Sequence, residues 1–577
     1  MKTTLSFVAL VALTLTACSD SPGGNDAGPL PFISDPLRSD AGCDWAQWGQ
    51  NWAHTGQACV AASGFGTALA TVTFDPFVEQ EVAEAGGDLL AHFATPLAVG
   101  DDLYMAVKSG TYVSCADAGT LGNPDPCGLD AWNLQTWTVK HLAWESGALT
   151  PKESFGSSWK PPPWQVVFGW EPVFQPALRD QVVWVPMAAG TVVRLDRHLA
   201  NPQAVNPFTD ANGNRFVTGP LVVDADGTLL YNVIELDPLL PTSADARGWL
   251  VRVPTSGAPT KVLYQSIVSG APAAGDQCPF SFRAGNIPGP YPATVPVPTG
   301  SCGSQRPGFN SGPAIGPGGV IFVVSRAHYA TNDASLVALN PDLTPRWTFR
   351  MRELLNDGCG VLATSCRQGA PMGVDPNTGL KPTVQVSDQG SSVPVALPDG
   401  AVLYGGFTGY NGSRGHLVKV SPNGKLMGTY DFGWDVTPAV WIHGGTYSII
   451  TKDNHYGNAN GEGPFNITQL SRDLTPEWKF TSTETRSCRT ESDGGLTCIS
   501  DHPDGFEWCV NAPAVGPDGT VYANSEDGRV YSIRQGGSLG EQRFLLQSLG
   551  AAYTPIAVDS KGRVYSMNGG VMTVVGQ

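Results

Sequence analysis

Basic residues are scarce in this sequence, and acidic residues outnumber them. The 577 residues include 34 Lys and Arg against 51 Asp and Glu, which gives a formal net charge of −17. Proteins that bind nucleic acids neutralise phosphates with clustered Lys and Arg, and no basic stripe occurs here. We therefore expect no nucleic-acid partner.

Long apolar runs and metal-binding cysteine spacings are also missing. Beyond residue 18 no segment is apolar for long enough to cross a membrane. No Cys-x-x-Cys or nearby His pair supports a zinc site, and no Cys-x-x-Cys-His motif supports a covalent haem. No helical period stands out either, whereas Gly-rich turns and short Val, Tyr and Trp strands are frequent. The composition therefore indicates an all-β protein.

The first 18 residues have the features of an export signal. Lys2 gives a positive start, Phe7 to Leu15 is a short apolar run, and Leu15-Thr-Ala-Cys18 resembles a bacterial lipobox. The resemblance implies acylation of Cys18; the alternative is an ordinary secretory signal with an incidental Cys. Residues 19–42 have the composition of a flexible tether. We expect attachment to a membrane of the bacterial cell envelope through this lipid, by the enteric sorting rule the outer membrane, on its periplasmic or surface side.

One hairpin pattern recurs about eight times after residue 43. Each copy is a short apolar strand beginning near a proline, then a tight Gly- or Asp-containing turn, then a second strand. The prolines that mark the copies are Pro96, Pro176, Pro220, Pro313, Pro394, Pro438, Pro513 and Pro555. The shortest interval, from Pro513 to Pro555, is 42 residues, close to the length of a four-stranded propeller blade.

Third and fourth strands follow most of the hairpins. The stretches 335–349 and 466–480 each read strand, Asp-Leu-Thr-Pro turn and strand, and 416–432 is a third example. The last copy has no fourth strand, which residues 70–74 could supply, closing the ring. The sequence therefore predicts an eight-bladed β-propeller over residues 43–577, or a seven-bladed one if the least regular copy, at Pro176, fails.

These repeats resemble the PQQ-like repeats of quinoprotein-type β-propellers. The features that match are Ala-Leu-Asn-x-Asp before Trp-Thr-Phe349, the Gly-Pro-Asp-Gly-Thr-Val-Tyr522 turn, and the opening Trp45-Ala-Gln-Trp48 to Gly56 stretch. The resemblance implies the fold, but dehydrogenases, scaffolds and lipoproteins all use these repeats. We expect the tryptophans to pack between blades.

Eleven cysteines remain beyond the lipobox, which is consistent with disulfides formed in an oxidising compartment. Their clustering predicts local pairs Cys43–Cys59, Cys115–Cys127, Cys278–Cys302 and Cys359–Cys366. One of Cys488, Cys498 and Cys509 is left over, and the sequence does not indicate which.

The predicted insertions fall on one face of the ring. In a blade with strands a to d, the a–b and c–d turns lie on one face, and the b–c loops and d–a connections lie on the other. Most turns of the first kind are short, whereas the long insertions are the b–c loop 112–130 and the d–a connections 144–175, 265–312, 352–392 and 481–511. Ordered loops cross-linked on a rigid scaffold usually carry binding; the alternative is that they shield the pore or resist proteolysis.

Polar and aromatic residues near the ends of inner strands on this face are candidate ligand-binding residues: Arg326, His328, Tyr329, Tyr410, Arg414, Asp435, Lys452, His455 and Tyr456. They could converge near the ring entrance, where a His-Tyr pair could do acid–base work. The alternative is that each His is a solvated or capped loop residue.

Three functions are compatible with this fold. A lipid-anchored binding or scaffold protein, with a protein or glycan partner on the long-loop face, has a precedent in the lipoprotein propeller of the outer-membrane barrel assembly machinery. A PQQ-dependent dehydrogenase of alcohols or sugars is disfavoured because typical members have adjacent cysteines, absent here. Soluble sugar-type quinoproteins lack these cysteines, so the class is not excluded. We predict no cofactor or metal, because no motif supports PQQ, calcium or another metal. The third function is a polysaccharide-active propeller enzyme.

Two short motifs offer no catalytic or metal site. Gly536-Gly-Ser538-Leu-Gly540 matches a nucleophile pattern but joins two predicted strands, so it reads as a turn. Residues 210–214 faintly resemble a calcium loop, but Arg215 stands where glycine is needed, and a polar turn is the better interpretation.

Overall fold

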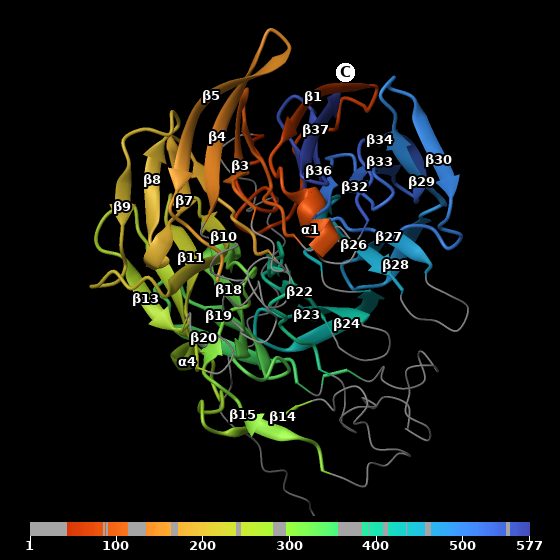
Figure 1. The fold of residues 1–577 in the computed structure, drawn as a ribbon. Helices are drawn as coiled ribbons and strands as arrows, with labels where there is room; N and C mark the ends of the chain where they lie inside the picture. Colours follow the sequence, from red (N-terminus) through yellow and green to blue (C-terminus); the bar gives the residue numbers. More distant parts are fainter. Residues whose placement is uncertain are drawn as a thin grey trace, which may run out of the picture.

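The computed structural model describes residues 43–84, 87, 91–112, 134–162, 171–237, 244–280, 296–352, 354–355, 383–390, 392–407, 414–433, 436–455, 463–549 and 554–577. Their strands form seven four-stranded antiparallel sheets and one sheet, in blade four, with an additional strand. The sheets lie around a central axis (Figure 1). This confirms the eight-bladed propeller, and the copy at Pro176 forms a blade like the others.

Among the first four blades, blades one, two and four each begin just after a marker proline, whereas Pro220 lies inside the first strand of blade three. Their strands are β2 (Leu97–Val99), β3 (Asp102–Gly110), β4 (Gln135–Glu145) and β5 (Ala148–Ser157); β6 (Ala177–Arg179), β7 (Val182–Pro186), β8 (Val192–Asp196) and β9 (Gln203–Val205); β10 (Arg215–Val223), β11 (Leu229–Glu235), β12 (Arg247–Val253) and β13 (Thr260–Leu263); and β17 (Ala314–Ile315), β18 (Ile321–Ala327), β19 (Ala334–Leu339) and β20 (Pro345–Arg350). The additional strand of blade four is β16 (Gln305–Arg306), which pairs with β18.

The remaining blades repeat the same meander. Their strands are β21 (Val395–Ala396), β22 (Val402–Phe407), β23 (Arg414–Val420) and β24 (Leu426–Gly433); β25 (Ala439–His443), β26 (Thr446–Asn454), β27 (Phe465–Ser471) and β28 (Pro476–Thr481); β31 (Ala514–Val515), β32 (Val521–Asn524), β33 (Arg529–Arg534) and β34 (Ser538–Phe544); and β35 (Ile556–Val558), β36 (Val564–Asn568), β37 (Val571–Gly576) and β1 (Thr67–Thr73).

The N-terminal strand closes the ring, as predicted. β1 pairs antiparallel with β37, so that Val72 lies opposite Met572 and Thr67 lies opposite Gly576. Blade eight therefore takes its outer strand from the start of the chain. This pairing satisfies the outer edge of β37, which would otherwise offer unpaired N–H and C=O groups to another chain.

An axial segment, residues 45–63, contacts all eight blades in sequence order. Its contacts lie close to the a–b turns. They are the Trp45–Ala98 bridge, Leu178 N to Ala46 O, the Gln47 amide with Val223, Ile315 N to Trp52 O, Ala396 N to Ala53 O, Val440 N to Thr55 O, Val515 N to Gly56 O and Ser63 N to Gly562 O. The axial segment thereby lines the inner edge of the ring on the short-turn side.

The tight turn between the first two strands of blade seven shows why glycine recurs at this place in the repeat. Gly519, in the Pro-Asp-Gly turn of blade seven, has a φ of +79°, a left-handed conformation that favours glycine. A Cβ at this position would also lie 2.7 Å from the indole of Trp441 in blade six. The turn therefore needs glycine both for its backbone and for the approach of the neighbouring blade.

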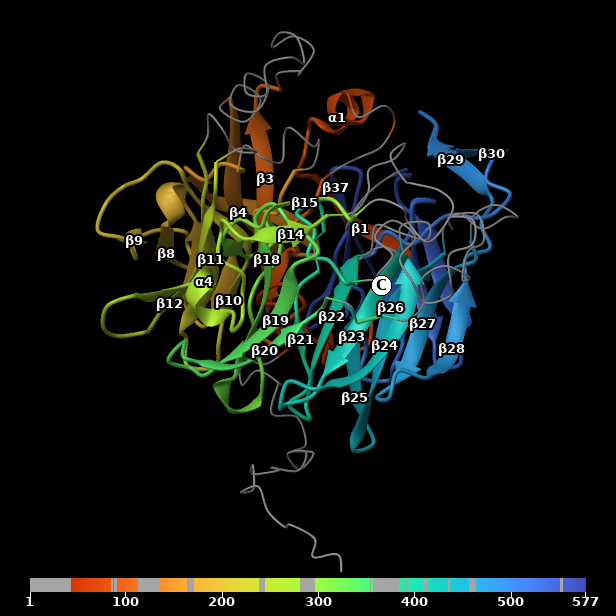
Figure 2. The ribbon, with the colours of Figure 1, turned by 90° about the horizontal axis from the view of Figure 1, so that it is seen from below.

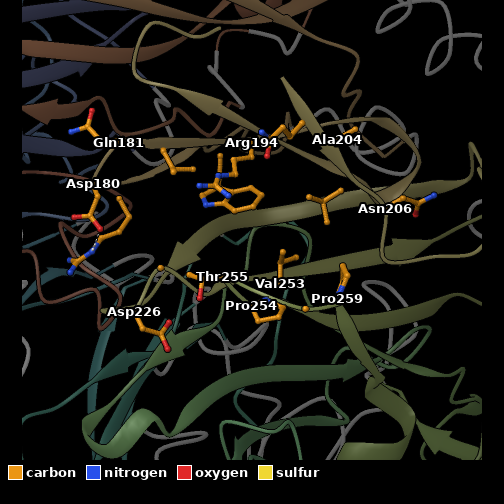
Figure 3. A pocket seen from close by; sticks show the side chains of 17 residues that line it. Asp180, Gln181, Arg194, Ala204, Asn206, Asp226, Val253, Pro254, Thr255 and Pro259 are labelled. Carbon is orange, nitrogen blue, oxygen red and sulfur yellow. Dashed lines mark ion pairs between the residues drawn. The ribbon is translucent and has the colours of Figure 1, made fainter. Parts of the chain in front are cut away.

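The two faces of the ring differ as predicted (Figure 2). Two extra hairpins lie within d–a connections: β14 (Gln277–Pro279) with β15 (Thr299–Ser301), and β29 (Arg486–Thr490) with β30 (Leu496–Ser500). The short helices are α1 (Val78–Glu84), α4 (Tyr264–Ile267), η1 (Ala188–Gly190) and η2 (Pro317–Gly319). A groove between blades two and three lies beside the short a–b turns instead (Figure 3).

The fold corrects one predicted connection and confirms two turns. The stretch 144–175 is not a d–a connection throughout, because β4 continues to Glu145 and β5 occupies 148–157. The sequence of β5 alternates little between apolar and polar residues, so this strand was not predicted. Residues 535–537 do join β33 to β34, so Ser538 lies in a hairpin, and Asp210 forms an ion pair with Arg215 in a polar turn.

Three of the cysteine predictions have an outcome. The structure contains Cys43–Cys59, Cys278–Cys302 and Cys488–Cys498, and Cys509 is the free, buried cysteine. Cys18, Cys115, Cys127, Cys359 and Cys366 lie outside the described residues. Each of the two extra hairpins is therefore cross-linked.

Candidate functional site

The predicted ligand-binding residues lie at the long-loop face where the structure describes them. Arg326 is in β18 and Lys452 in β26, both second strands of their blades, and His328, Tyr329 and His455 follow these strands. Tyr410, Asp435 and Tyr456 lie outside the described residues, and Arg414 begins β23 with a side chain that is not described.

Arg326 belongs to a buried ionic cluster that the sequence did not reveal. It lies directly opposite Arg306 across the β16–β18 pair. Asp388 joins the two guanidinium groups: Arg306 donates to both of its oxygens at 2.7 and 2.6 Å, and Arg326 donates to one at 2.9 Å. Burial raises the pKa of Asp388, but the two guanidinium groups outweigh it and bring the pKa to about 2.

His328 is locked into the same cluster. Its Nδ1 accepts a hydrogen bond of 2.9 Å from Arg306 Nε, and its backbone oxygen accepts one from Arg326. Burial, with Arg306 and Arg326, lowers the pKa of His328 to about 2. A neutral ring whose Nδ1 already accepts from a guanidinium cannot take a proton near neutral pH. These contacts do not fit the expected acid–base role of the His328-Tyr329 pair.

Lys452 and His455 face different partners. Lys452 is buried and acts electrostatically on Cys509, whose thiol pKa is raised by burial and by Glu526 and Glu507. His455 Nε2 lies 2.8 Å from Asp453, which also accepts from Lys479 at 2.6 Å. Burial raises the pKa of Asp453, but the interactions with His455 and Lys479 outweigh it and bring the pKa to about 2. His455 is therefore a partner of Asp453 beside blade five.

The residues of blade four were expected to converge with those of blade six, and this convergence stays a prediction. Among the described residues no hydrogen bond or ion pair joins Arg326 or His328 to Lys452 or His455. The segments 408–413 and 434–435, which hold the predicted residues of blade five and its exit, lie outside the description.

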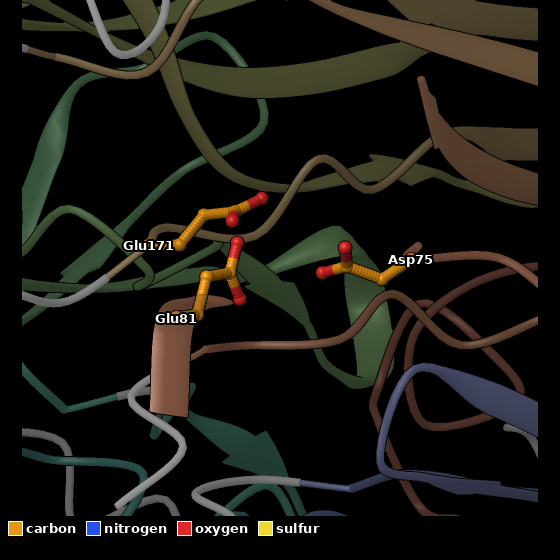
Figure 4. Close-up of side chains that lie close together, drawn as sticks. All are labelled: Asp75, Glu81 and Glu171. Carbon is orange, nitrogen blue, oxygen red and sulfur yellow. The ribbon is translucent and has the colours of Figure 1, made fainter. Parts of the chain in front are cut away.

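A third buried cation occupies the corresponding place in blade one. Lys108, near the end of β3, lies 2.8 Å from Asp75 and 2.5 Å from Glu81, and it also pairs with Glu171. Figure 4 shows the three carboxylates facing one another, Glu81 from α1 and the others from connecting segments. The sequence did not reveal this cluster, although Lys108, Arg326 and Lys452 occupy corresponding positions late in the second strands of their blades.

Three carboxylates surround a single ammonium group in this cluster, and the pKa values reflect this excess of acidic groups. Burial raises the pKa of Glu81 to about 8, against the opposing effect of Lys108, with Asp75 and Glu171 adding to the rise. Burial also lowers the pKa of Lys108, but the three carboxylates outweigh it and the net shift is strongly upward. The three carboxylates could otherwise hold a metal ion; here the Lys108 ammonium is the cation that they surround.

His92 connects blade one to the cluster of blade four. Its two ring nitrogens lie 2.7 Å from the backbone oxygen of Glu171 and 2.9 Å from that of Gln389. Gln389 is next to Asp388, and Asn310 donates to the backbone oxygen of Asp388 at 3.3 Å. Polar contacts therefore cross the centre of the long-loop face.

The axis itself is filled by side chains at this level. Trp48, from the axial segment, packs with Ala94, Val173 and Val393, which precede blades one, two and five. Side chains from blades so far apart in the ring can meet only at the axis. The residues before the first strands also bond from blade to blade, as Ser311 does to Ser392 and Thr437 does to Asn511.

The described residues do not fit the cofactor that the repeat resemblance would imply. PQQ is a planar, multiply charged anion that needs unpaired cations and a calcium site with free carboxylates. Arg306 and Arg326 already share Asp388, and Lys108 already occupies the three-carboxylate cluster. Trp48 and its neighbours fill the axis itself.

The matches of this chain lie among solved structures. No family model matches the chain, and no curated protein matches it. Among solved structures, a europium-containing methanol dehydrogenase has a TM-score of 0.46 at 12% identity, over 91% of this chain and 89% of its own. BamB from Moraxella catarrhalis has a TM-score of 0.37 at 12% identity, over 89% and 99%. A quinohemoprotein alcohol dehydrogenase from Comamonas testosteroni has a TM-score of 0.46 at 12% identity, over 93% and 82%.

The chain is an eight-bladed β-propeller. The similar structures include both kinds of protein that its repeats resemble, quinoprotein dehydrogenases and BamB. At identities of 12% and TM-scores below 0.5, these similarities assign no function to the chain.

Proposed function

We propose that this chain is an exported binding protein of the bacterial cell envelope, anchored by a lipid on Cys18, that holds a protein or glycan partner on its long-loop face. The observation that carries the proposal is the difference between the two faces. The axial segment and short turns line one face, and the other carries the cross-linked hairpins β14–β15 and β29–β30 (Figure 2).

The ionic clusters support binding over catalysis at this face. Arg306, Arg326 and Lys108 are nearly inaccessible, and each is matched by internal carboxylates. Such groups fix the positions of the connections that carry Asp388 and Glu171. The connections are thereby pre-organised, which reduces the entropy that binding would cost. The surface offered to a partner is a rigid one.

The lipid anchor is the other half of the proposal. No helix within the described ranges has the length and hydropathy to span a bilayer. Residues 19–42 would extend to about 80 Å at most, so a tether of this length leaves the propeller free of the bilayer surface. A lipoprotein Cys carries several acyl chains, which gives firm attachment where one chain gives only marginal binding.

Metabolic labelling with an alkyne fatty acid tests the anchor. The full chain and a Cys18→Ser variant are expressed in a bacterium, with Cys509→Ser as a matched control that changes another unpaired cysteine. We expect label and membrane sedimentation for the full chain and for Cys509→Ser, and neither for Cys18→Ser. Equal labelling of Cys18→Ser would refute the anchor.

A further inference from the structure

The groove between blades two and three lies away from the long-loop face. It encloses 640 Å³, within the range of small-ligand sites. The a–b turns of blades two and three and the c–d turn of blade three form its walls (Figure 3). Trp184, only 6% exposed, lies at its base with Val253.

Three side chains form a strip across one wall of the groove. Trp184 lies directly opposite Arg194, and Arg194 lies directly opposite Gln203, on β7, β8 and β9. Directly opposed residues of antiparallel strands present neighbouring side chains on the same face of the sheet. An aromatic ring, a cation and an amide therefore follow one another toward the outer edge of blade two.

Arg194 is a cation without a partner in the described part of the molecule. No hydrogen bond or ion pair of its guanidinium occurs there, and the amides of Gln181 and Gln203 are likewise without partners. Arg179, at the inner end of the groove, differs. Its Nη2 donates to Ala225 O at 3.0 Å, and its guanidinium lies 5.5 Å from the Trp52 ring centre. Gln203 is the free donor beside Arg194, whereas Gln181 lies next to Asp180 (Figure 3).

Acceptors stand at the other end of the groove. Figure 3 shows the carboxylates of Asp180 and Asp226 apart from Arg194. The hydrogen bond from Asp224 is the main cause that lowers the pKa of Asp226 to about 2. Asp226 is therefore ionised at neutral pH and can only accept hydrogen bonds. Val205, Pro254 and Pro259 supply apolar wall between the two ends.

We propose that this groove binds a sugar chain whose residues carry a carboxylate, such as a short oligo-uronate. The sugar carboxylate pairs with Arg194, for which a planar guanidinium is the matching fork. Sugar hydroxyls donate to Asp180 and Asp226, and the two glutamines bond to the remaining oxygens. The C–H face of the ring packs on the valines and prolines. The groove volume accommodates a chain of a few sugar residues.

Calorimetric titration with tri-uronates tests this site. The chain without its signal and Cys18, residues 19–577, is titrated with trigalacturonate, trimannuronate and triguluronate, and with the methyl ester of each as a neutral counterpart. Arg194→Gln removes the free cation. Arg346→Gln, on exposed β20 of blade four, makes the same charge change elsewhere.

We expect saturable binding of at least one tri-uronate and none, or at least tenfold weaker binding, of its ester. Arg194→Gln should weaken binding at least tenfold and Gln203→Ala at least threefold, whereas Arg346→Gln should leave the Kd unchanged. No binding of any tri-uronate, equal binding of the ester, or an unchanged Kd in Arg194→Gln would each overturn the proposal. The test needs neither the lipid nor a long-loop partner, so it fails or succeeds separately from the proposed function.

Discussion

Arg306 and Arg326 lie directly opposite each other on antiparallel strands, and both guanidinium groups bond to the single carboxylate of Asp388. Two like charges in this position repel, and opposed like charges destabilise a strand pair. The pair is therefore held by a residue from a different connection, 82 positions away from Arg306.

Asp388→Asn should destabilise the protein strongly. The substitution keeps the shape of the side chain but leaves two buried guanidinium groups without a counter-charge, a change that typically costs about 3–5 kcal/mol. Urea unfolding followed by tryptophan fluorescence measures it. Asp504→Asn, an exposed aspartate, is the matched control and should change stability by about 0.5 kcal/mol or less. A loss for Asp388→Asn no larger than that of the control would contradict the account.

The free energy of unfolding should fall as the pH rises from 4.5 to 8, because of Glu81. Its pKa in the folded protein is raised from 4.5 to about 8, so folding favours the protonated form. The resulting stability is fully present below pH 4.5 and is lost as the pH rises through 8, with a slope of at most about 1.4 kcal/mol per pH unit.

Glu81→Gln isolates this contribution. The amide cannot ionise, so the decline of unfolding free energy over this pH range should become shallower in the variant. Unfolding at several pH values measures the two slopes, and Glu79→Gln on the same helix is the control. Identical slopes for wild type and Glu81→Gln would show that Glu81 does not titrate as described.

Gly519→Ala should cost more than Gly536→Ala. Both glycines have positive φ, near +79° and +84°, so both substitutions strain the backbone, by about 1 kcal/mol. Only at Gly519 would the new Cβ also meet a neighbour, 2.7 Å from the Trp441 indole, whereas nothing lies within 4 Å at Gly536. Denaturant midpoints of the two variants measure the difference, and equal losses would argue against close contact between blades six and seven.

PQQ with calcium should not stabilise the protein. Arg306, Arg326 and Lys108 are already paired with carboxylates, so a cofactor that uses these cations would have to break those pairs to bind. The thermal unfolding midpoint should shift by less than about 1 °C, because a ligand at concentration L stabilises by RT ln(1 + L/Kd), which is near zero when L stays far below Kd. Dye reduction with alcohols and sugars is the second readout. A large shift accompanied by turnover would show a functional quinone site.

The repeated parts of the fold could be predicted because each copy carries its own local signal. The marker prolines, the turn glycines such as Gly519 and the closing strand are all readable without distant contacts. The closing strand was predicted at 70–74 and lies at 67–73. The strand β5 was missed because its sequence alternates little between apolar and polar residues, and only one of its ten residues is buried.

The ionic clusters could be predicted only in part. Lys108, Arg326 and Lys452 recur late in second strands, which is a usable signal for buried cations. Their carboxylate partners Asp388 and Glu171 come from connections that follow no repeat. Such a partner is identified only when the folded chain brings it within hydrogen-bond distance, so its role could not be inferred from spacing.

Site-specific photo-crosslinking in living cells tests the central claim, that the long-loop face holds the partner. A photoreactive amino acid replaces Ile499 or Thr299, exposed in the two extra hairpins, or Asp342 or Lys425, exposed in c–d turns of the opposite face. We expect discrete, saturable adducts to one protein or glycan from Ile499 or Thr299 and none from Asp342 or Lys425. Adducts confined to Asp342 and Lys425 would contradict the assignment of the binding face.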